Sequence, residues 1–401
     1  MDQDISNNRN SIKILLVSSS SGSRGGGELY LLYLGRALAQ KGHKVTLWAS
    51  SHARMDELSN SFSCFGDVIR SSYLNTYDHP GRSLSTRFNF STSNALAAEW
   101  RTTHPDIIHI NKQNLEDGLD LLRAAKHSGL PSLCTIHLTQ TAKYLKAQFA
   151  SLRDFISRKA LMMYPGPLVT VLESRKQDLA RFIGKPERIS VVPNGVPLFD
   201  LVKLRGLRRI KRGELQLNTE DYLFVALGRM VPQKRPMLFL EIAKKIHARI
   251  PQAKFLWVGD GELGADWDLW VEANRLTGII QRVTWQPDVQ PFLCAADVFL
   301  HVAEYEGLPL ALLEAMSAGL PCAVKENLLA EMPFLNPANS ISIGDDDSWI
   351  NALIDQNSLS TLGAAARQVV EEKFTHNRMA EAYEPIYRSL LRKNADNSNA
   401  G

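Results

Sequence analysis

Short apolar segments alternate with helical patterns along most of this 401-residue chain. The first segment, Ile12–Ser18 (IKILLVS), is a nearly continuous apolar run, as expected of a strand that is covered on both faces. A glycine-rich turn follows it, and then a helical pattern from about Glu28 to Lys41, which Gly42 ends. This alternation predicts an α/β fold with a parallel, doubly wound sheet. Further strands are expected at Val45–Ala49, Asp106–Ile110, Ser132–His137 and Leu168–Leu172.

The same alternation begins again after Asn194, which predicts a second Rossmann-like domain. Tyr222–Leu227 is the first expected strand of this half, and Pro236–Ala248 is its first helix. The turn signal Pro193-Asn194-Gly195 and the basic, irregular stretch after it place the domain boundary between the two series. The remaining strands are expected at Lys254–Val258, Val283–Trp285, Val298–Val302 and Cys322–Val324.

The length of the chain suits two domains at roughly 150 residues each. The final helical pattern comes after the second sheet is complete, so this helix could cross back to the first domain. The expected organisation is a disordered N-terminus over 1–10, an N-terminal Rossmann-like domain over 11–195, a linker over 196–213, a C-terminal Rossmann-like domain over 214–370, a C-terminal helix over 371–393 and a disordered tail over 394–401.

The composition excludes several classes of protein. With 44% hydrophobic and 22% charged residues, the chain has the profile of a globular protein. A net charge of +4 does not by itself indicate a nucleic-acid partner. The four cysteines are scattered, which argues against a disulfide framework or a zinc site. The polar N-terminus is unlike a signal peptide, and no apolar run reaches the ~18 residues of a membrane span, so a cytoplasmic location is expected.

A glycine loop, Ser23-Arg24-Gly25-Gly26-Gly27-Glu28, stands between the first strand and the first helix. Glycines allow a ligand to approach the backbone closely, and free N–H groups at a helix start favour anions. A plain tight turn is an equally open interpretation of this loop alone. A nicotinamide site is disfavoured, because Tyr30 occupies the third glycine position of the dinucleotide motif and Trp48-Ala49-Ser50 lacks its ribose-binding acid.

A second loop, Gly228-Arg229-Met230-Val231-Pro232-Gln233-Lys234, follows the first strand of the second half. Arg229 and Lys234 beside Gly228 could hold a diphosphate, because guanidinium and ammonium groups neutralise the charge that develops on a leaving phosphate. For a lone pair of cations, a solvated basic loop is the simpler alternative.

The third motif has two glutamates. Glu306 stands in the turn with Gly307 and Leu308, and Glu314 lies in an otherwise apolar helical stretch. A carboxylate in such surroundings is costly unless it has a partner, and sugar hydroxyls are suitable donors. The alternative is a helix that turns Glu314 to solvent. His137 ends an expected strand, where doubly wound sheets hold ligands, although a lone histidine is more often structural.

Together and in this order, these motifs resemble family 4 of the retaining glycosyltransferases, which have the GT-B fold of two Rossmann-like domains with a cleft between them. The resemblance spans about 12–390 and includes the interdomain signature Pro193-Asn194-Gly195-Val196. It implies that the N-terminal domain receives the acceptor and that the C-terminal domain holds the nucleotide-sugar donor. The donor-site and catalytic residues that it implies are Gly26, Gly27, His137, Gly228, Arg229, Lys234, Glu306, Gly307, Leu308 and Glu314.

Three positions depart from the family pattern. Pro197 replaces the usual aspartate after the interdomain signature, and Val302-Ala303 replaces a Pro-Ser pair. The segment Lys325–Glu331 replaces a Gly-Gly-x-x-Glu motif that normally cradles the donor, and Glu331 could fill the role of the missing acid.

The resemblance implies a retaining hexosyltransferase that takes a UDP or GDP sugar and extends a glycan or glycolipid, in cell-surface polysaccharide or lipopolysaccharide biosynthesis. No cofactor and no metal are expected, because the two cations would replace a divalent ion, and Asp345-Asp346-Asp347 is interpreted as a solvated loop or helix cap. Two alternatives stay open: a sugar-nucleotide epimerase, which would interconvert free sugar nucleotides without an acceptor, and a non-catalytic nucleotide-sugar-binding homologue.

Two basic segments bear on partners. Lys143–Lys159 (KYLKAQFASLRDFISRK) is a candidate amphipathic helix that could lie on an anionic membrane surface, although packing on the N-terminal sheet is the favoured interpretation. Lys203–Arg212 is expected to be a solvated linker. It is a poor nucleic-acid site, because no aromatic residues stand between its basic side chains.

Overall fold

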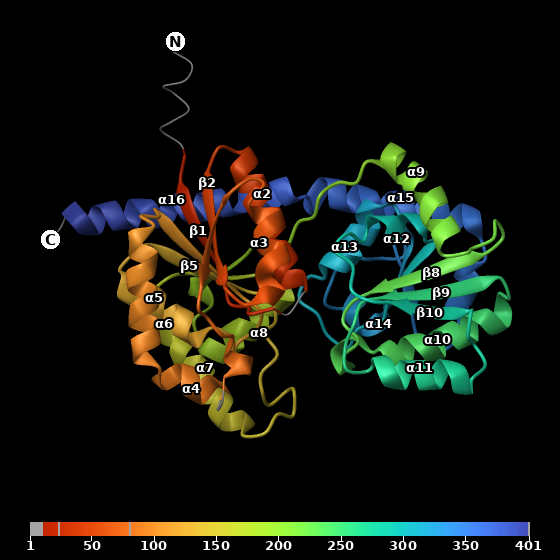
Figure 1. The fold of residues 1–401 in the computed structure, drawn as a ribbon, viewed down its shortest axis with the longest axis horizontal. Helices are drawn as coiled ribbons and strands as arrows, with labels where there is room; N and C mark the ends of the chain where they lie inside the picture. The colour runs from red at the N-terminus through yellow and green to blue at the C-terminus, as the bar shows by residue number, and fades with distance from the viewer. Residues whose placement is uncertain (1–10, 23–24, 80–81, 400–401) are drawn as a thin grey trace, which may run out of the picture. The chain divides into compact units, whose positions relative to one another are not determined.

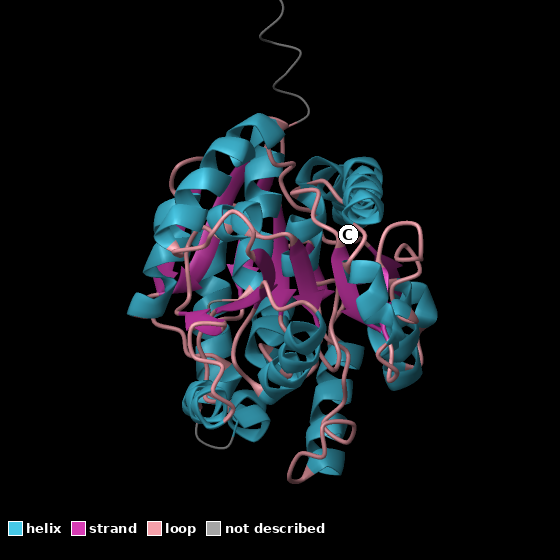
Figure 2. Cartoon of the chain, turned by 90° about the vertical axis from the view of Figure 1, so that its right-hand side faces the viewer, coloured by secondary structure: helices cyan, strands magenta, loops and turns pink. Residues whose placement is uncertain are grey.

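The computed structural model describes residues 11–22, 25–79 and 82–399. The chain divides into two compact units, the first formed by Met1–Gly195 with His376–Gly401 and the second by Val196–Thr375. Two expectations fall outside the described residues: the N-terminus over 1–10, and Ser23 and Arg24 of the glycine loop. Figure 1 shows the strands and helices of both units, and Figure 2 shows the strands with helices around them.

The described part of the first unit contains one seven-stranded parallel sheet, with the order β3-β2-β1-β4-β5-β6-β7. Its central strands are the predicted ones, and their residues are almost all buried, including the polar His109, Asn111 and Lys112 of β4. The strands at the two edges, β3 and β7, are not among those expected, and both are partly exposed. The strands are Lys13–Ser18 (β1), Lys44–Ser50 (β2), Asp67–Ser71 (β3), Ile107–Lys112 (β4), Ser132–Ile136 (β5), Leu168–Thr170 (β6) and Ile189–Val191 (β7).

Helices cover both faces of this sheet. Ile108 and Ile110 of β4 join a core with helices α5, α6 and α7. His109 lies between them in sequence, so its side chain points to the other face, where it meets Tyr387 of α16. The helices of this unit are Gly26–Gln40 (α2), Asp56–Phe62 (α3), Arg82–Phe88 (α4), Phe90–Thr102 (α5), Leu119–Ser128 (α6), Ala150–Met163 (α7), Glu173–Ile183 (α8) and His376–Asn399 (α16).

The second unit repeats this plan with a six-stranded parallel sheet in its described residues, in the order β10-β9-β8-β11-β12-β13. The edge strand β13 is not among the expected strands, and β10 ends at Val283 rather than beginning there. The strands are Tyr222–Leu227 (β8), Ala253–Val258 (β9), Ile280–Val283 (β10), Val298–His301 (β11), Cys322–Lys325 (β12) and Ile341–Ile343 (β13).

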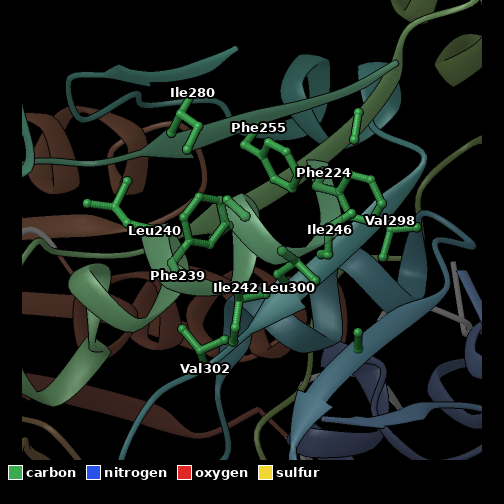
Figure 3. Close-up of a cluster of buried hydrophobic side chains, with 14 of the residues drawn as sticks. Phe224, Phe239, Leu240, Ile242, Ile246, Phe255, Ile280, Val298, Leu300 and Val302 are labelled. Atoms are coloured by element: carbon green, nitrogen blue, oxygen red, sulfur yellow. The ribbon is translucent and has the colours of Figure 1, made fainter. Parts of the chain in front are cut away.

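Alternate residues of these strands build the core of the second unit. Phe224, Phe255 and Leu300 face α10, which contributes Phe239 and Ile246 (Figure 3). Other helices pack against the opposite side of the unit, where α13 meets α15. The helices are Leu201–Glu214 (α9), Pro236–Arg249 (α10), Gly264–Ala273 (α11), Gln290–Ala295 (α12), Leu310–Ser317 (α13), Glu326–Leu329 (α14) and Gln356–Lys373 (α15).

The segment over 196–213 is not the irregular, solvated linker that the sequence indicated. It contains helix α9, which belongs to the second unit. The side chain of Asp200 caps the helix by accepting the N–H of Val202 at 2.9 Å. Arg208 and Arg212 then form ion pairs with Asp297, with nitrogen–oxygen distances of 2.6 and 3.2 Å. The basic residues thus fix a helix, because one acidic side chain receives two of them.

The C-terminal helix also differs from the expected range. Helix α15 ends at Lys373, and a separate helix, α16, begins at His376 and extends to Asn399, through part of the tail expected to be disordered. Helix α16 belongs to the first unit, where Tyr383 and Tyr387 are fully buried. The hydroxyl of Tyr30 donates to the hydroxyl of Tyr383 at 2.7 Å, so polar contacts fix this helix to α2.

None of the described helices combines the length and the apolar character that crossing a bilayer requires.

Candidate active site

The cationic loop of the second unit begins where β8 ends. Gly228 has φ of +154°, and the indole N–H of Trp257 donates to its carbonyl at 2.8 Å. A Cβ atom at the neighbouring Gly259 would lie 2.2 Å from that same carbonyl oxygen. The two strand-end loops therefore touch through backbone, which is possible only because glycine lacks a side chain.

Arg229 and Lys234 lie in this loop but in different surroundings. Arg229 is exposed, and no described residue forms an ion pair or hydrogen bond with its guanidinium. Lys234 ends the short helix Pro232–Lys234, and its ammonium contacts the carboxylate of Glu306. The loop therefore presents one open cation and one cation that is held in place by an acid.

Backbone contacts join the lysine loop to the glutamate loop. The N–H of Glu304 donates to the carbonyl of Gln233 at 2.8 Å, and the side-chain amide of Gln233 donates to the carbonyl of Tyr305 at 3.0 Å. These bonds explain why Lys234 and Glu306, which are 72 positions apart in the sequence, come together. The expected cationic and acidic motifs of this unit thus form one site at the carboxyl edge of its sheet.

Both glutamates of the acidic motif are buried. Glu306 is 5% exposed and Glu314, inside α13, is 2% exposed, so neither carboxylate faces bulk solvent. The alternative that Glu314 simply turns to solvent is therefore excluded. Gly307 and Leu308 are buried too, and they lead the chain from Glu306 into α13.

His301 is a residue of this site that sequence analysis missed. It is the last residue of β11, and its Nε2 atom lies 3.7 Å from the carboxylate of Glu306. Burial lowers the pKa of His301 to about 4, with Glu306 acting in the opposite direction, so the imidazole is neutral near pH 7. A polar residue at the carboxyl end of a buried strand was the signal that could have found it.

The glycine loop of the first unit opens α2. The carboxylate of Glu28 accepts the N–H of Gly25 at 2.9 Å, which satisfies one free donor of the helix start. Gly26 is exposed, whereas Gly27 is buried, and a Cβ atom at Gly27 would lie 1.7 Å from the side chain of Gln113. Gly27 is therefore required by close packing, and Gly26 leaves the helix N-terminus open to an anion.

His137 connects to this loop through Asn111, a residue that sequence analysis did not single out. The Nδ2 atom of Asn111 donates to the carbonyl of Gly27 at 3.0 Å, and its Oδ1 atom lies 2.7 Å from Nε2 of His137. Because the amide N–H₂ already faces Gly27, its oxygen accepts from His137, and the proton of the imidazole is on Nε2. Nδ1 is then left as a hydrogen-bond acceptor.

The imidazole of His137 is neutral. Burial lowers its pKa to about 4. The ring packs edge-on against Tyr30, with 4.7 Å between the ring centroids. A neutral, oriented imidazole at the end of β5 can accept a hydrogen bond from a hydroxyl group, but it cannot stabilise a phosphate by charge.

The segment that departs from the family pattern, Lys325–Glu331, lies at the end of β12 and in α14. The ammonium of Lys325 pairs with Asp345 at 3.0 Å, and the amide of Asn327 donates to the carbonyl of Glu304 at 2.7 Å. The segment is thus tied to the glutamate loop by a backbone contact. In the acidic run over 345–347, Asp346 accepts the N–H of Ser348 at 2.9 Å, which is a turn contact just before the short helix Ser348–Leu353.

Comparisons with known proteins agree with the two units. The model of Glycosyltransferase Family 4 matches residues 24–198, and the model of Glycosyl transferases group 1 matches residues 221–355. The chain is 30% identical to the UDP-Gal:alpha-D-GlcNAc-diphosphoundecaprenol alpha-1,3-galactosyltransferase of Escherichia coli, over 71% of this chain and 76% of that protein. It is 25% identical to the lipopolysaccharide core biosynthesis glycosyltransferase LpsE of Rhizobium meliloti, over 43% of this chain and 52% of the relative.

The fold is also similar to that of a solved protein. The structure of Anabaena Alr3699/HepE, in complex with UDP and glucose, aligns with a TM-score of 0.74 at 16% identity. The alignment covers 94% of this chain and 100% of the Anabaena chain.

Proposed function

Since the chain belongs to the GT-B glycosyltransferases of group 1 and family 4, we propose that it is a retaining enzyme that moves a hexose from a nucleotide-diphosphate sugar to a lipid-linked glycan. One observation carries this proposal: the exposed Arg229 and the glutamate-held Lys234 share one loop at the carboxyl edge of the second sheet. A planar guanidinium and a compact ammonium together suit the diphosphate of a leaving nucleotide.

The proposed reaction is a front-face displacement. The oxygen of the acceptor hydroxyl forms a bond to the anomeric carbon on the side from which the diphosphate leaves. The bond from that carbon to the β-phosphate oxygen breaks, and its electron pair goes to the diphosphate. The proton of the hydroxyl passes to a β-phosphate oxygen. Arg229 and Lys234 stabilise the charge that develops on this leaving group, so we expect no metal to be required.

The other site residues take positioning roles in this proposal. Glu306 holds Lys234 and accepts a hydroxyl of the donor sugar, and Glu314 accepts the hydroxyls of the ribose. Gly26 leaves the N-terminus of α2 open to the donor phosphates, and Gly27 allows the close packing on Gln113 that holds this helix start. The neutral His137, held by Asn111, accepts a further sugar hydroxyl through Nδ1.

The relatives support a choice of substrate class. The E. coli relative uses a UDP-sugar and an acceptor carried on diphosphoundecaprenol, and the R. meliloti relative is a lipopolysaccharide enzyme. We therefore propose a UDP-hexose donor, with GDP-hexose as the alternative, and a glycan acceptor on a lipid carrier at the inner face of the cytoplasmic membrane. The product would be a cell-surface polysaccharide or lipopolysaccharide.

Thermal unfolding in the presence of UDP, GDP, ADP and their hexoses tests the donor. A ligand that binds the native state raises the Tm, and we expect the largest rise with a uridine nucleotide. Incubation of the enzyme with that donor and a glycan on polyprenyl diphosphate should then give an α-linked product. No rise in Tm with any nucleotide, or a β-linked product, would contradict the proposal.

A further inference from the structure

Large apolar side chains are exposed on α7 and on the turn that precedes it. Figure 1 shows where α7 lies in the fold. The exposed fractions of these side chains range from 46% at Leu152 to 81% at Phe149. We call this set the apolar ridge of α7. It consists of Leu145, Phe149, Leu152, Phe155 and Met163.

The exposed residues of the ridge border the buried side of α7. Ile156, Ser157 and Leu161 are the buried residues of the helix. At about 100° per residue, Phe155 lies roughly 100° or more from each of them, whereas Leu152 and Met163 lie within about 40° of Ile156, at the edge of the buried side. The sequence favoured packing of this segment on the sheet, and it predicted a helix from Lys143. The structure starts the helix at Ala150 rather than at Lys143. It bears out the packing, because Ile156 and Leu161 lie in the core of the first unit, and it leaves other apolar residues of the helix exposed.

Basic side chains surround the ridge. Lys143, Lys146, Arg158 and Lys159 are all exposed. The ammonium of Lys159 lies 5.0 Å from the centre of the Phe155 ring, so one of these cations is next to the apolar surface itself. Positive charge and apolar area are thus interspersed on the same surface.

The acidic groups near the ridge are engaged elsewhere. Glu116 forms an ion pair with Arg153, with 2.6 Å between Nη2 and Oε2. The carboxylate of Asp154 accepts the backbone N–H groups of Ala142 and Lys143 at 2.7 and 3.1 Å. These contacts fix the turn before α7. Among the described residues, no carboxylate forms an ion pair with the side chains of Lys143, Lys146, Arg158 or Lys159.

The backbone at the top of the ridge is held in an uncommon conformation. Phe149 has φ of +54° and Lys146 has φ of +52°, which side chains larger than glycine rarely adopt. The aromatic ring of Phe149 is nevertheless exposed to solvent. The fold therefore keeps a large aromatic ring in solvent at a conformational cost.

We propose that the apolar ridge of α7 and its basic rim dock this protein on an anionic membrane surface. An amphipathic helix with aromatic and aliphatic residues on one side and lysine and arginine around them is the form that lies in a bilayer interface. A protein partner fits less well, because lysine is depleted at the centre of protein interfaces. The inference goes beyond the proposed function, and it would bring the enzyme to the surface that carries a lipid-linked acceptor.

Co-sedimentation with lipid vesicles tests this inference on the full-length protein. We expect binding to vesicles of phosphatidylglycerol with phosphatidylcholine, and at least about tenfold weaker binding to phosphatidylcholine alone. The double variant Phe149→Ser and Phe155→Ser should bind the anionic vesicles about tenfold more weakly, because it removes apolar area from the bilayer interface. Lys146→Glu and Lys159→Glu should each weaken binding roughly fivefold or more, and added salt should reduce these differences.

Leu269→Ser is the matched control, because Leu269 is 66% exposed on α11 of the second unit and should not affect vesicle binding. Equal binding of the wild type and the double variant would overturn the inference. A dimer in solution that the double variant dissociates would also overturn it, since a second copy would then cover the ridge. Transfer to a water-soluble acceptor tests the proposed function by itself, so a protein that binds vesicles but transfers no sugar would contradict that function alone.

Discussion

The candidate site residues are charged in the second unit and neutral in the first. In the second unit the candidate groups are charged: Arg229 is exposed, and the ammonium of Lys234 meets the buried carboxylate of Glu306. In the first unit the candidate side chain is the neutral His137, held by the amide of Asn111. The second unit can therefore stabilise an anion by the formal charge of side chains, whereas the first unit offers a neutral imidazole and the N-terminus of α2.

In the proposed reaction, this difference predicts different roles for the site residues of the two units. Removing a charge in the second unit should reduce the rate strongly, because preorganised charges contribute most where charge develops in the transition state. Removing a hydrogen bond in the first unit should have a smaller effect, because one neutral hydrogen bond has a modest net worth.

The largest expected effect follows from removal of either cation. Lys234→Ala and Arg229→Ala should each lower kcat about 100- to 1,000-fold, because each removes a charge that stabilises the leaving diphosphate. Initial rates of sugar transfer measure the loss. Lys245→Ala is the matched control, since Lys245 is half exposed in the same unit and pairs with Asp347. If the rate of Lys234→Ala were within a few-fold of the wild-type rate, the charged residues of the second unit would not have the larger catalytic role.

A smaller effect is expected at Asn111. Asn111→Leu should lower kcat about tenfold, since His137 loses the acceptor that fixes its proton on Nε2. Asn111→Asp should instead raise the pKa of His137 from about 4, because a carboxylate favours the imidazolium. The activity of this variant should then fall on the acid side of a pH profile at a higher pH than in the wild type. Identical profiles would show that Asn111 does not position His137.

The buried His109 of the first unit predicts how the free energy of unfolding depends on pH. Burial lowers the pKa of His109 to about 3, and the ordinary value is 6.5, so the unfolded chain binds a proton that the folded chain excludes between these values. This histidine should therefore make the free energy of unfolding fall by about 1.4 kcal/mol per unit as the pH decreases through that range.

In His109→Gln this contribution to the slope should disappear. Urea unfolding of both proteins between pH 7 and pH 5 measures it, and the difference in slope matters rather than the absolute stability, because Gln alters the contacts to Tyr387 and Thr135. If the free energy of unfolding of the two proteins changed equally with pH, His109 would not resist protonation in the folded state.

The smallest change in the rate of sugar transfer is expected when a metal chelator is added. If Arg229 and Lys234 neutralise the leaving group, EDTA should change the rate by less than about twofold, since a catalytic metal would contribute several kcal/mol. Loss of activity that magnesium restores would show that the charge of the second unit is insufficient. The Asp345→Asn variant checks whether the acidic run takes part, and it should behave like the wild type.

Strands and motifs could be predicted from the sequence where the residues of one segment alone determine its structure. Strands such as β1 and β8 are buried on both faces and therefore have nearly continuous apolar sequences. The edge strands β3, β7 and β13 were missed, because they are short or partly exposed and carry a weak pattern. The motif residues Lys234 and Glu306 were singled out by residue type and context, and the family resemblance implied that both belong to the donor site; the contact between them was not predicted.

Other features depended on partners far away in the chain. Helix α9 was taken for a linker, because nothing in its basic sequence shows that Asp297 receives Arg208 and Arg212. Asn111 was missed for the same reason, since its importance comes from its contacts with His137 and Gly27. His301 was missed although its position at the end of β11 was a usable signal. The exposure of Phe149 could not be predicted either, because an amphipathic pattern does not tell which apolar side is covered.

Calorimetric titration of UDP and UMP into the wild type, Arg229→Ala and Lys234→Ala tests the central role of the two cations most directly. The wild type should bind UDP more than about tenfold more tightly than UMP, because charge-assisted hydrogen bonds reach the second phosphate. Each variant should lose most of that preference while its affinity for UMP changes little. If both variants kept the preference of the wild type for UDP, the diphosphate would not be bound by this loop, and the account would be wrong.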